Sequence, residues 1–391
     1  MATKASYKVE NKDNSMTLMP DVDIVARIFD HIDNKTTDLG QSSWREPVAN
    51  YQSPERFEAE LALLRSSWIV FCPSTALAES GDYIARDAAG VPLVVVRGND
   101  GQARAFRNAC RHRGVQVANG QGCASVFVCP YHGWAYENDG SLRSVPHKEG
   151  FPGLEKEKRG LVALDCLEEN GLIFVKQNAG TDDNVAKSHL LGIVPDGYHV
   201  IKSETLEIEA NWKLHLESSL EGYHIRSTHQ KTFFPVQYDN LTVVEAFGKN
   251  TRVAFPYQAI EGLRNKPKST WSPDGRLTFV YHLFPNVIIS TFPDCLQVVI
   301  LEPIGLQLTR QHVFLLADRE ADEKTMETIL AGQEFAKLGA IEDREVVLSA
   351  QRGLASGANE YLEFGLFERA IGRFHAALTD AISSKSGTSN K

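Results

Sequence analysis

Hydrophobic and polar positions follow different patterns along this 391-residue chain. Residues 1–50 are mostly polar, show weak periodicity and contain a predicted turn at residues 30–35. We expect them to form an arm that packs on the later, larger domain or on a neighbouring subunit. Helical periodicity then begins at Pro54 and ends near Trp68. Ser53 is suited to cap this helix, because its side-chain oxygen can accept a hydrogen bond from a free backbone amide.

Short β-rich runs replace the helical pattern after Trp68. They occupy residues 68–71 and 91–96, and the hairpin signal Asn99-Asp100-Gly101 follows the second of them. Runs at residues 160–164 and 172–175 complete a small antiparallel β domain. The composition turns polar at residues 177–183, which predicts a linker. The predicted segments are therefore residues 1–50, 51–176 and 177–391.

The second half of the chain mixes strand and helix patterns. Strand-like runs cover residues 242–253, 277–282, 287–290, 297–301 and 311–316. Helical periodicity without proline covers residues 323–352 and 361–382, and Gly332 and Gly339 are expected to weaken the first helix or divide it. Strands followed by helices indicate an α+β domain, in which helices cover one face of an antiparallel sheet.

Two short segments with metal-binding side chains lie inside the β-rich domain. They are Cys110-Arg111-His112 and Cys129-Pro130-Tyr131-His132, separated by 16 residues (113–128). Each offers one sulfur and one nitrogen, and a glycine that permits a close turn follows each histidine. This set suits a Rieske [2Fe–2S] cluster, in which two cysteines bind one iron and two histidines the other. A Cys₂His₂ zinc site usually keeps its cysteines together and its histidines together, and four unrelated core residues are the remaining alternative.

Composition and charge narrow the function classes. The chain is 42% hydrophobic and 23% charged, as expected of folded domains. Its formal net charge of −9 disfavours binding to nucleic acid. The sequence has neither a long apolar run nor a secretory leader pattern, so we expect a cytoplasmic protein that does not bind membranes. The cysteines outside the two segments are expected to be reduced core residues or, for Cys123, a loop residue.

The segments Asn108–Gly114 and Cys129–Trp134 resemble the cluster-binding segments of the Rieske non-haem iron oxygenases, in particular their large, catalytic α subunits. Rieske proteins of respiratory complexes have two further cysteines that form a disulfide, whereas this chain has Val115 and Tyr131 there. The resemblance implies an all-β Rieske domain at residues 51–176. It also implies an α+β catalytic domain of the helix-grip type at residues 177–391, which binds a mononuclear non-haem Fe(II).

A second candidate metal site follows the linker. His224 and His229 can bind one metal if the helix that carries His224 loosens before His229, and a carboxylate would complete a facial triad with open positions on ferrous iron. The spacing alone also fits ordinary surface or core histidines. The stretch from Asn211 to His229, however, resembles the mononuclear iron segment of the same oxygenases. The aspartate ligand of that family corresponds to Asp343, with Glu342 as its rival, and Asn211 is expected to support the ligands through hydrogen bonds.

Glu221 lies three residues before His224, and we expect both side chains on one helical face. The resemblance gives this position a catalytic acid that couples the cluster of one subunit, through His132, to the iron of the next, through His224. Most relatives carry aspartate there, and glutamate occurs in a subset that includes oxygenases of carnitine and betaine type. A solvated glutamate is the alternative. His215 and Glu217 lie outside the family pattern, and we interpret His215 as a packing or pocket residue.

These features predict the terminal oxygenase component of a multicomponent Rieske oxygenase, a mono- or dioxygenase that uses O₂. A NAD(P)H-dependent reductase, directly or through a ferredoxin, would supply electrons. No Gly-x-Gly-x-x-Gly signal follows a strand, which agrees with NAD and flavin residing on the partner and not on this chain. The resemblance further implies a homotrimer, with or without a β subunit.

The small organic substrate is predicted to be an aromatic compound, the commonest substrate of the family, which suggests aromatic hydrocarbon catabolism. The alternative, which Glu221 favours, is attack beside an amine or quaternary nitrogen, leading to oxidative N-dealkylation. Aromatic residues that could line a pocket or belong to the core are Phe255, Tyr257, Tyr281, Phe284 and Phe292. A Rieske electron carrier without oxygenase activity is the remaining alternative, but it leaves roughly 210 residues after the linker without a role.

Overall fold

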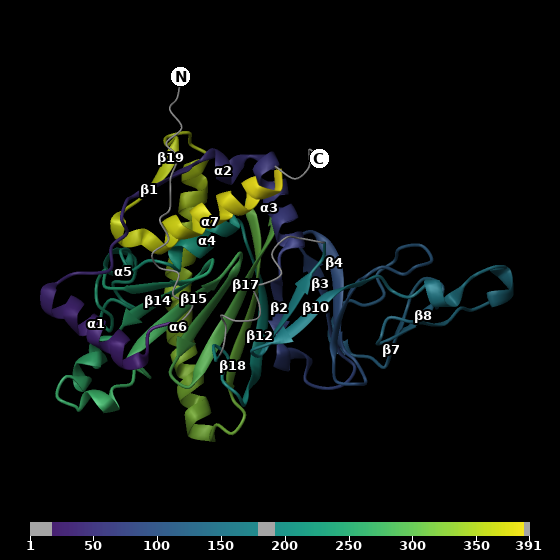
Figure 1. Ribbon diagram of the computed structural model, residues 1–391, viewed down its shortest axis with the longest axis horizontal. Coiled ribbons are helices and arrows are strands. Elements are labelled where there is room, and N and C mark those ends of the chain that lie inside the picture. The colour runs from purple at the N-terminus through teal and green to yellow at the C-terminus, as the bar shows by residue number, and fades with distance from the viewer. Residues whose placement is uncertain (1–17, 179–191, 387–391) are drawn as a thin grey trace.

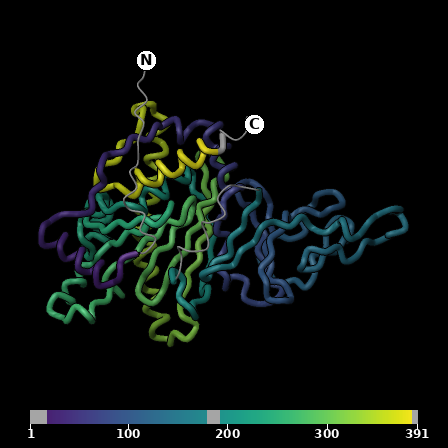
Figure 2. Tube along the Cα trace, in the orientation of Figure 1, coloured from purple at the N-terminus to yellow at the C-terminus, as the bar shows by residue number. Residues whose placement is uncertain are grey.

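The computed structural model describes residues 18–178 and 192–386 (Figure 1). A small lobe, which contains the predicted cluster segments, projects to one side of a larger lobe, and the chain trace in Figure 2 shows the same arrangement. The predicted linker at residues 177–183 falls mostly outside the described residues, as does the start of the N-terminal arm. The three predicted segment boundaries therefore stay predictions.

The small lobe consists of antiparallel strands. One sheet has the order β2-β11-β10-β5-β4-β3-β6, and another has the order β7-β8-β9. The strands are β2 (Ile69–Pro73), β3 (Asp82–Ala88), β4 (Val91–Arg97), β5 (Ala103–Arg107), β6 (Gly120–Cys123), β7 (Val126–Val128), β8 (Ala135–Glu137), β9 (Leu142–Ser144), β10 (Ala163–Glu169) and β11 (Leu172–Lys176). The predicted hairpin at residues 99–101 joins β4 to β5. An all-β lobe is thus confirmed.

The larger lobe is organised around an antiparallel sheet with the order β12-β18-β17-β16-β15-β14-β13. Its strands are β12 (Tyr198–Ile208), β13 (Val243–Phe247), β14 (Asn250–Pro256), β15 (Leu277–Leu283), β16 (Val287–Phe292), β17 (Cys295–Gly305) and β18 (Leu308–Asp318). The sequence prediction missed β12, because exposed residues fill most of this strand and hide the apolar alternation. The run at 242–253 is two strands, separated by a turn at Gly248, whose φ is +61°.

Helices pack on both faces of the larger lobe's sheet, and the two longest helices, α6 and α7, lie on the same face. The helices are α1 (Asp21–Asn34), α2 (Ala49–Gln52), α3 (Pro54–Ser66), α4 (Trp212–Ser218), α5 (Ile225–Thr228), α6 (Glu323–Leu354) and α7 (Arg369–Ser386). Short 3₁₀ turns are η1 (Ser74–Leu77), η2 (Lys148–Gly150), η3 (Lys156–Lys158), η4 (Gln258–Leu263), η5 (Lys268–Thr270) and η6 (Leu366–Glu368). In Figure 1, α7 lies across one end of the sheet, where Phe374 joins Val253 and Val280 in one apolar cluster. The predicted α+β class with helices on the sheet is confirmed.

The opposite face of the sheet packs on the small lobe and on α1. Ile69 and Phe71 of β2 belong to the same apolar cluster as Val298 and Ile300 of β17. Ile24 and Ile28 of α1 are fully buried in this cluster. The sheet is therefore covered by different elements on its two faces, and the face toward α6 and α7 is the one that carries the candidate site.

Two local predictions are wrong. The predicted turn at residues 30–35 lies mostly inside α1, which ends where Lys35 takes a positive φ of 54°. Tyr361–Phe364 (β19) does not begin a helix, because it pairs with β1 (Trp44–Pro47). The helix α6 continues through Gly332 and Gly339 without a break, and α3 begins as predicted, with the Ser53 side chain accepting from the Arg56 amide. No helix among residues 18–178 and 192–386 is long and apolar enough to cross a membrane.

Candidate metal centres

The loops after β5 and β7 carry the two Cys/His segments at the outer end of the small lobe (Figure 1). Both loops have the same backbone pattern. The amide of Gly114 donates to the Cys110 carbonyl at 2.9 Å, and the amide of Gly133 donates to the Cys129 carbonyl at 3.0 Å. Both glycines have positive φ, +78° and +71°, which other residues rarely adopt. Glycine therefore lets each loop fold back over its cysteine.

The four candidate donors are arranged as a pair of sulfurs and a pair of rings. Burial raises the pKa of the Cys129 thiol, and its hydrogen bond with Cys110 raises it further. The ring centroids of His112 and His132 lie 4.7 Å apart. A Rieske cluster needs both sulfurs on one iron and both imidazoles on the other. The donor set therefore fits a [2Fe–2S] cluster better than a zinc ion, which would need all four donors around one point.

Aromatic side chains hold this donor set in place. The Trp134 ring stacks on His112 with 5.0 Å between centroids and 7° between planes. The Tyr136 hydroxyl lies 3.2 Å from the Cys110 sulfur and accepts a hydrogen bond from the Arg111 amide at 2.9 Å. Cys123 lies outside the set, because its thiol donates to the Ser80 carbonyl. All six cysteines are free thiols.

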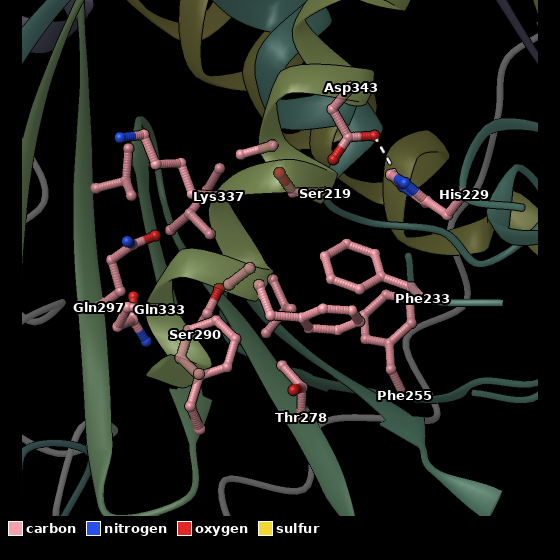
Figure 3. A pocket seen from close by; sticks show the side chains of 18 of the residues that line it. Ser219, His229, Phe233, Phe255, Thr278, Ser290, Gln297, Gln333, Lys337 and Asp343 are labelled. Atoms are coloured by element: carbon pink, nitrogen blue, oxygen red, sulfur yellow. Dashed lines mark ion pairs between the residues drawn. The ribbon is translucent and has the colours of Figure 1, made fainter. Parts of the chain in front are cut away.

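His224, His229 and Asp343 form the second candidate centre. The two histidines flank α5, a single helical turn, and Asp343 comes from α6. Each of the three residues offers one ligand atom, and these atoms all lie within 4.8 Å of one another. The Asp343 Oδ1 atom lies 3.5 Å from Nε2 of His224 and 3.1 Å from Nε2 of His229 (Figure 3). The structure therefore brings together the three residues that the sequence proposes as iron ligands.

The environment of His229 suits a metal ion. Its Nδ1 lies 2.8 Å from Oε2 of Glu342, and because a carboxylate only accepts, the ring proton resides on Nδ1. In a neutral imidazole, the form that binds a metal, Nε2 then carries the lone pair. This atom is buried and makes no hydrogen bond within the described part of the chain, although Asp343 is close. A lone pair that faces a carboxylate is unfavourable unless a cation lies between them, and a His₂-carboxylate set suits non-haem iron.

The electrostatics of the site also favour a positive charge. Burial lowers the pKa of His224, but hydrogen bonds to Asp343 and Glu221 outweigh burial and raise this pKa to about 10. Burial raises the pKa of Asp343, and the two histidines lower it by more, so the net shift is downward. In both cases the charged form is stabilised. A bound divalent cation would take the place of the proton on His224.

The geometry separates Asp343 from its rival Glu342. Asp343 faces Nε2 of both histidines, whereas Glu342 binds the opposite side of one ring and accepts a hydrogen bond from Thr232 at 2.5 Å. Glu342 therefore occupies the position of a carboxylate that orients a histidine ligand, and Asp343 that of the ligand.

Glu221 lies in the turn before α5 and not on a helix, which corrects the predicted helical face. The turn forms because the Glu221 carboxylate accepts hydrogen bonds from the backbone amides of Tyr223 and His224. The same carboxylate also binds Nδ1 of His224. Glu221 therefore contacts the ring of a candidate iron ligand, as the prediction requires, but from a turn and not from the predicted helix.

Asn211 supports the site only indirectly. Its side chain caps α4 by accepting from the Lys213 amide at 3.1 Å, and it donates to the Leu306 carbonyl at 2.9 Å and the Tyr51 carbonyl at 3.3 Å. Among the described residues, Asn211 forms no hydrogen bond with a candidate iron ligand, so the expected hydrogen-bond support of the ligands is not observed there. Glu217 accepts from the Tyr51 hydroxyl at 2.7 Å in the buried interior.

A cavity of about 1240 Å³ adjoins the second centre, between the sheet and α6 (Figure 3). Of the aromatic candidates, Phe255, Tyr257 and Phe292 line this cavity, whereas Tyr281 and Phe284 belong to the core clusters. His215 also lines it, and burial lowers the pKa of this histidine to about 4, so it is neutral at pH 7.

The sequence prediction missed cavity residues, among them two aromatic ones. Phe233 lines the cavity with its ring centroid 4.6 Å from that of His229, and Phe335 packs on Phe233 from α6 at 5.8 Å. Phe233 follows His229 by four residues, so its place one turn beyond a candidate ligand is the signal that could have identified it. For Phe335, on the exposed helix α6, the sequence offers no comparable signal.

Family comparisons agree with this architecture. Residues 195–384 match the family described as "Ring hydroxylating alpha subunit (catalytic domain)". Residues 67–161 match the family described as "Rieske [2Fe-2S] domain". The two matches coincide with the larger and the small lobe, respectively.

Individual relatives cover most of the chain. The carnitine monooxygenase oxygenase subunit of Escherichia coli (strain K12) is 29% identical over 366 residues, which is 86% of this chain and 94% of that protein. The chloroplastic choline monooxygenase of Spinacia oleracea is 27% identical over 86% of this chain and 78% of that protein. Naphthalene 1,2-dioxygenase from Rhodococcus sp. has a similar fold, with a TM-score of 0.76, 20% identity and coverage of 93% of this chain and 98% of that chain.

Proposed function

The chain belongs to the Rieske non-haem iron oxygenases, as a large, catalytic subunit, and we propose that it oxidises a carbon atom beside an amine or quaternary nitrogen. It is an oxidoreductase and the terminal oxygenase component of a system in which a reductase supplies electrons and O₂ is the oxidant. It has a Rieske [2Fe–2S] domain and a catalytic domain of the mononuclear iron type.

The similarity to carnitine and choline monooxygenases over 86% of the chain carries the proposed substrate class. Both of these relatives are named for quaternary ammonium compounds. The predicted aromatic substrate, and with it aromatic hydrocarbon catabolism, lacks this support. The fold does not decide between the two classes, because naphthalene dioxygenase shares it. The alternative that Glu221 favours in the sequence is therefore the better supported one.

We assign the cluster to Cys110, Cys129, His112 and His132, and the mononuclear iron to His224, His229 and Asp343. When bound, these groups supply electrons one at a time and a site for O₂ activation. The chain holds the ring of His229 through Glu342 and that of His224 through Glu221. It also excludes bulk water from the buried Nε2 of His229.

We further propose a homotrimer in which electrons pass between neighbouring subunits. Figure 1 places the loops around β7 and β8 at the end of the small lobe that points away from α5 and α6. The cluster segments and the candidate iron ligands of one chain are therefore at separate ends of the molecule. His132 is exposed, so a neighbouring subunit can reach it, and Glu221 contacts His224. Glu221 is the residue we assign to the connection between the neighbouring subunit's His132 and the iron ligand.

The cavity is chemically suited to a cationic nitrogen near the iron. Figure 3 shows the rings of Phe233 and Phe255 on the same side of the cavity as His229. Aromatic faces attract ammonium groups, and the acidic Asp343 and Glu221 add negative charge to the same end. In the overall reaction, two electrons and two protons convert O₂ and a C–H bond into C–OH and water. The hydroxylated carbon then releases the amine and becomes a carbonyl.

A single-turnover experiment tests this function without the natural reductase. The protein is reduced with dithionite, freed of excess reductant and mixed with ¹⁸O₂ and one candidate substrate. γ-Butyrobetaine and choline are compared with naphthalene and benzoate, and products are identified by mass spectrometry. The proposal predicts an amine and an ¹⁸O-labelled aldehyde from a quaternary ammonium compound. Ring hydroxylation, with no oxidation of either ammonium compound, would contradict it.

A further inference from the structure

One end of the cavity carries hydrogen-bonding side chains that no assigned role uses. In Figure 3, Gln297, Gln333 and Lys337 lie on the side of the cavity opposite His229 and Asp343. Gln297 extends from β17 in the sheet, and the other two residues come from α6. This end of the cavity therefore has polar groups on two facing walls.

The sheet side of this group offers unused donors and acceptors. Gln297 is paired in register with Ser290 of β16, so both side chains lie next to each other on the cavity face. The Gln297 amide forms no hydrogen bond with another described residue. On the facing helix, Gln333 donates to the Cys295 sulfur at 3.5 Å, a weak bond and its one side-chain hydrogen bond among the described residues. Most of the hydrogen-bonding capacity of these amides thus remains for a ligand.

The helix side supplies cationic side chains as well as an amide. Gln333, Lys337 and Arg344 all line the cavity, and their spacing of four and seven residues puts them on one helical face. Two of these side chains are cations. Glu334, three residues before Lys337 on α6, also lines the cavity, and it is exposed like Lys337 and Arg344. From β12, Lys202 and Glu204 also line the cavity and contribute one positive and one negative charge.

The positions of these residues along α6 also indicate how long the substrate is. Lys337 and Gln333 precede Asp343 by six and ten residues, which places them about 9 Å and about 15 Å from it along the helix axis. A reacting carbon must lie within a few ångströms of the iron ligands. A group that reaches the Lys337–Gln333 region is therefore roughly 5–10 Å from that carbon, a separation of several bonds.

The geometry points to a subsite in which Lys337, Gln333 and Gln297 bind a carboxylate of the substrate, opposite its reacting end. This assignment rests on the proposed function and refines it. The substrate is then a zwitterion, with its ammonium group among the aromatic residues near Asp343 and its carboxylate at the polar end. A choline-like cation without a carboxylate would leave Lys337 and the amides without a partner, and a hydrocarbon would do the same.

Matched ligands test the subsite. γ-Butyrobetaine is compared with butyltrimethylammonium, which lacks the carboxylate, by single-turnover rate and by equilibrium binding. We expect a preference for the zwitterion on the order of 10- to 100-fold. Lys337→Met and Gln297→Leu should each reduce this preference by about tenfold. Lys324→Met is the control, because Lys324 lies on the same helix outside the cavity lining and its loss should leave the preference unchanged.

The same design separates this subsite from the proposed function. If both ammonium compounds react equally well and Lys337→Met has no effect, the subsite is refuted while the proposed function stands. If neither ammonium compound is bound or oxidised, the proposed function fails, and 3-phenylpropanoate is then compared with 3-phenylpropanamide by binding. Tighter binding of the acid that Lys337→Met abolishes would retain the subsite, and equal binding of the two would reject it.

Discussion

Replacing Asp343 and Glu342 one at a time distinguishes a metal ligand from its support. Both are adjacent carboxylates on α6, and both interact with His229. Asp343 faces Nε2 of both histidines, so Asp343→Asn removes the anionic ligand of the candidate triad. Glu342→Gln leaves the triad complete and weakens the hydrogen bonds of this side chain with His229, which it orients, and with Thr232. The two changes should therefore differ greatly in their effect on Fe(II) affinity.

The structure sets the expected magnitudes. Loss of a carboxylate that orients a metal-binding histidine typically costs 10- to 100-fold in metal affinity. The Glu342 side chain is 28% exposed, so water screens part of its charge, and glutamine retains a carbonyl that can accept from Nδ1. We therefore expect about a tenfold loss for Glu342→Gln, which is about 1.4 kcal/mol. Asp343→Asn should cost more than about 100-fold.

The assay is an anaerobic Fe(II) titration of protein that retains its cluster but has been depleted of mononuclear iron. Iron bound per cluster gives the affinity, and the visible spectrum of the cluster is the internal standard. Glu345→Gln is the matched control, because this exposed residue lies on the same helix outside the cavity lining. Retained iron binding in Asp343→Asn together with its loss in Glu342→Gln would exchange the roles of the two residues and refute our assignment.

Other predictions concern stability and the shape of the cavity. Glu60→Gln should destabilise the protein by about 3–5 kcal/mol in urea unfolding. The reason is that Lys213, which is 1% exposed and lies 2.8 Å from Glu60, would become a buried unpaired charge. An unchanged unfolding midpoint would contradict this prediction. Gly339→Ala would place a Cβ atom 2.2 Å from the Phe233 ring, so it should lower the free energy of unfolding by about 1–3 kcal/mol and also lower substrate affinity. At Gly332 an added Cβ atom would meet nothing within 4 Å, so Gly332→Ala should stabilise α6. His282 is fully buried, and burial lowers its pKa to about 4, below the unfolded value of 6.5. Because the unfolded state then binds the extra proton, stability should fall by up to about 3 kcal/mol as the pH drops from 6.5 to 4, and His282→Gln should remove this part of the pH dependence of unfolding.

The cluster segments were predictable because their chemistry is local. Each Cys/His segment and its glycine lie within a few residues, and the positive φ of Gly114 and Gly133 is a requirement that the sequence itself expresses. The run of β-branched residues in β4 and the capped start of α3 are local signals of the same kind. By contrast, α1 was missed because its buried residues stand among many polar ones, and its apolar face becomes significant only against the sheet.

The second centre depends on contacts between distant segments. His229 and Asp343 are separated by 113 residues, and only the family resemblance connects them in the sequence. The sequence also cannot decide which of two adjacent carboxylates on a helix faces the histidines. Phe335 and Lys337 reach the cavity because α6 crosses the sheet, and nothing in the local pattern of α6 indicates this. The cavity residues that would contact the substrate can therefore be identified only from the folded structure.

Anaerobic analysis of iron and acid-labile sulfide, with electron paramagnetic resonance of the reduced protein, tests the two-centre account most directly. We predict three irons and two sulfides per chain and a Rieske-type signal, since a [2Fe–2S] cluster and one mononuclear iron are both required. Two irons and two sulfides that do not change when Fe(II) is added would instead indicate an electron carrier. That result would contradict the roles we assign to His224, His229 and Asp343.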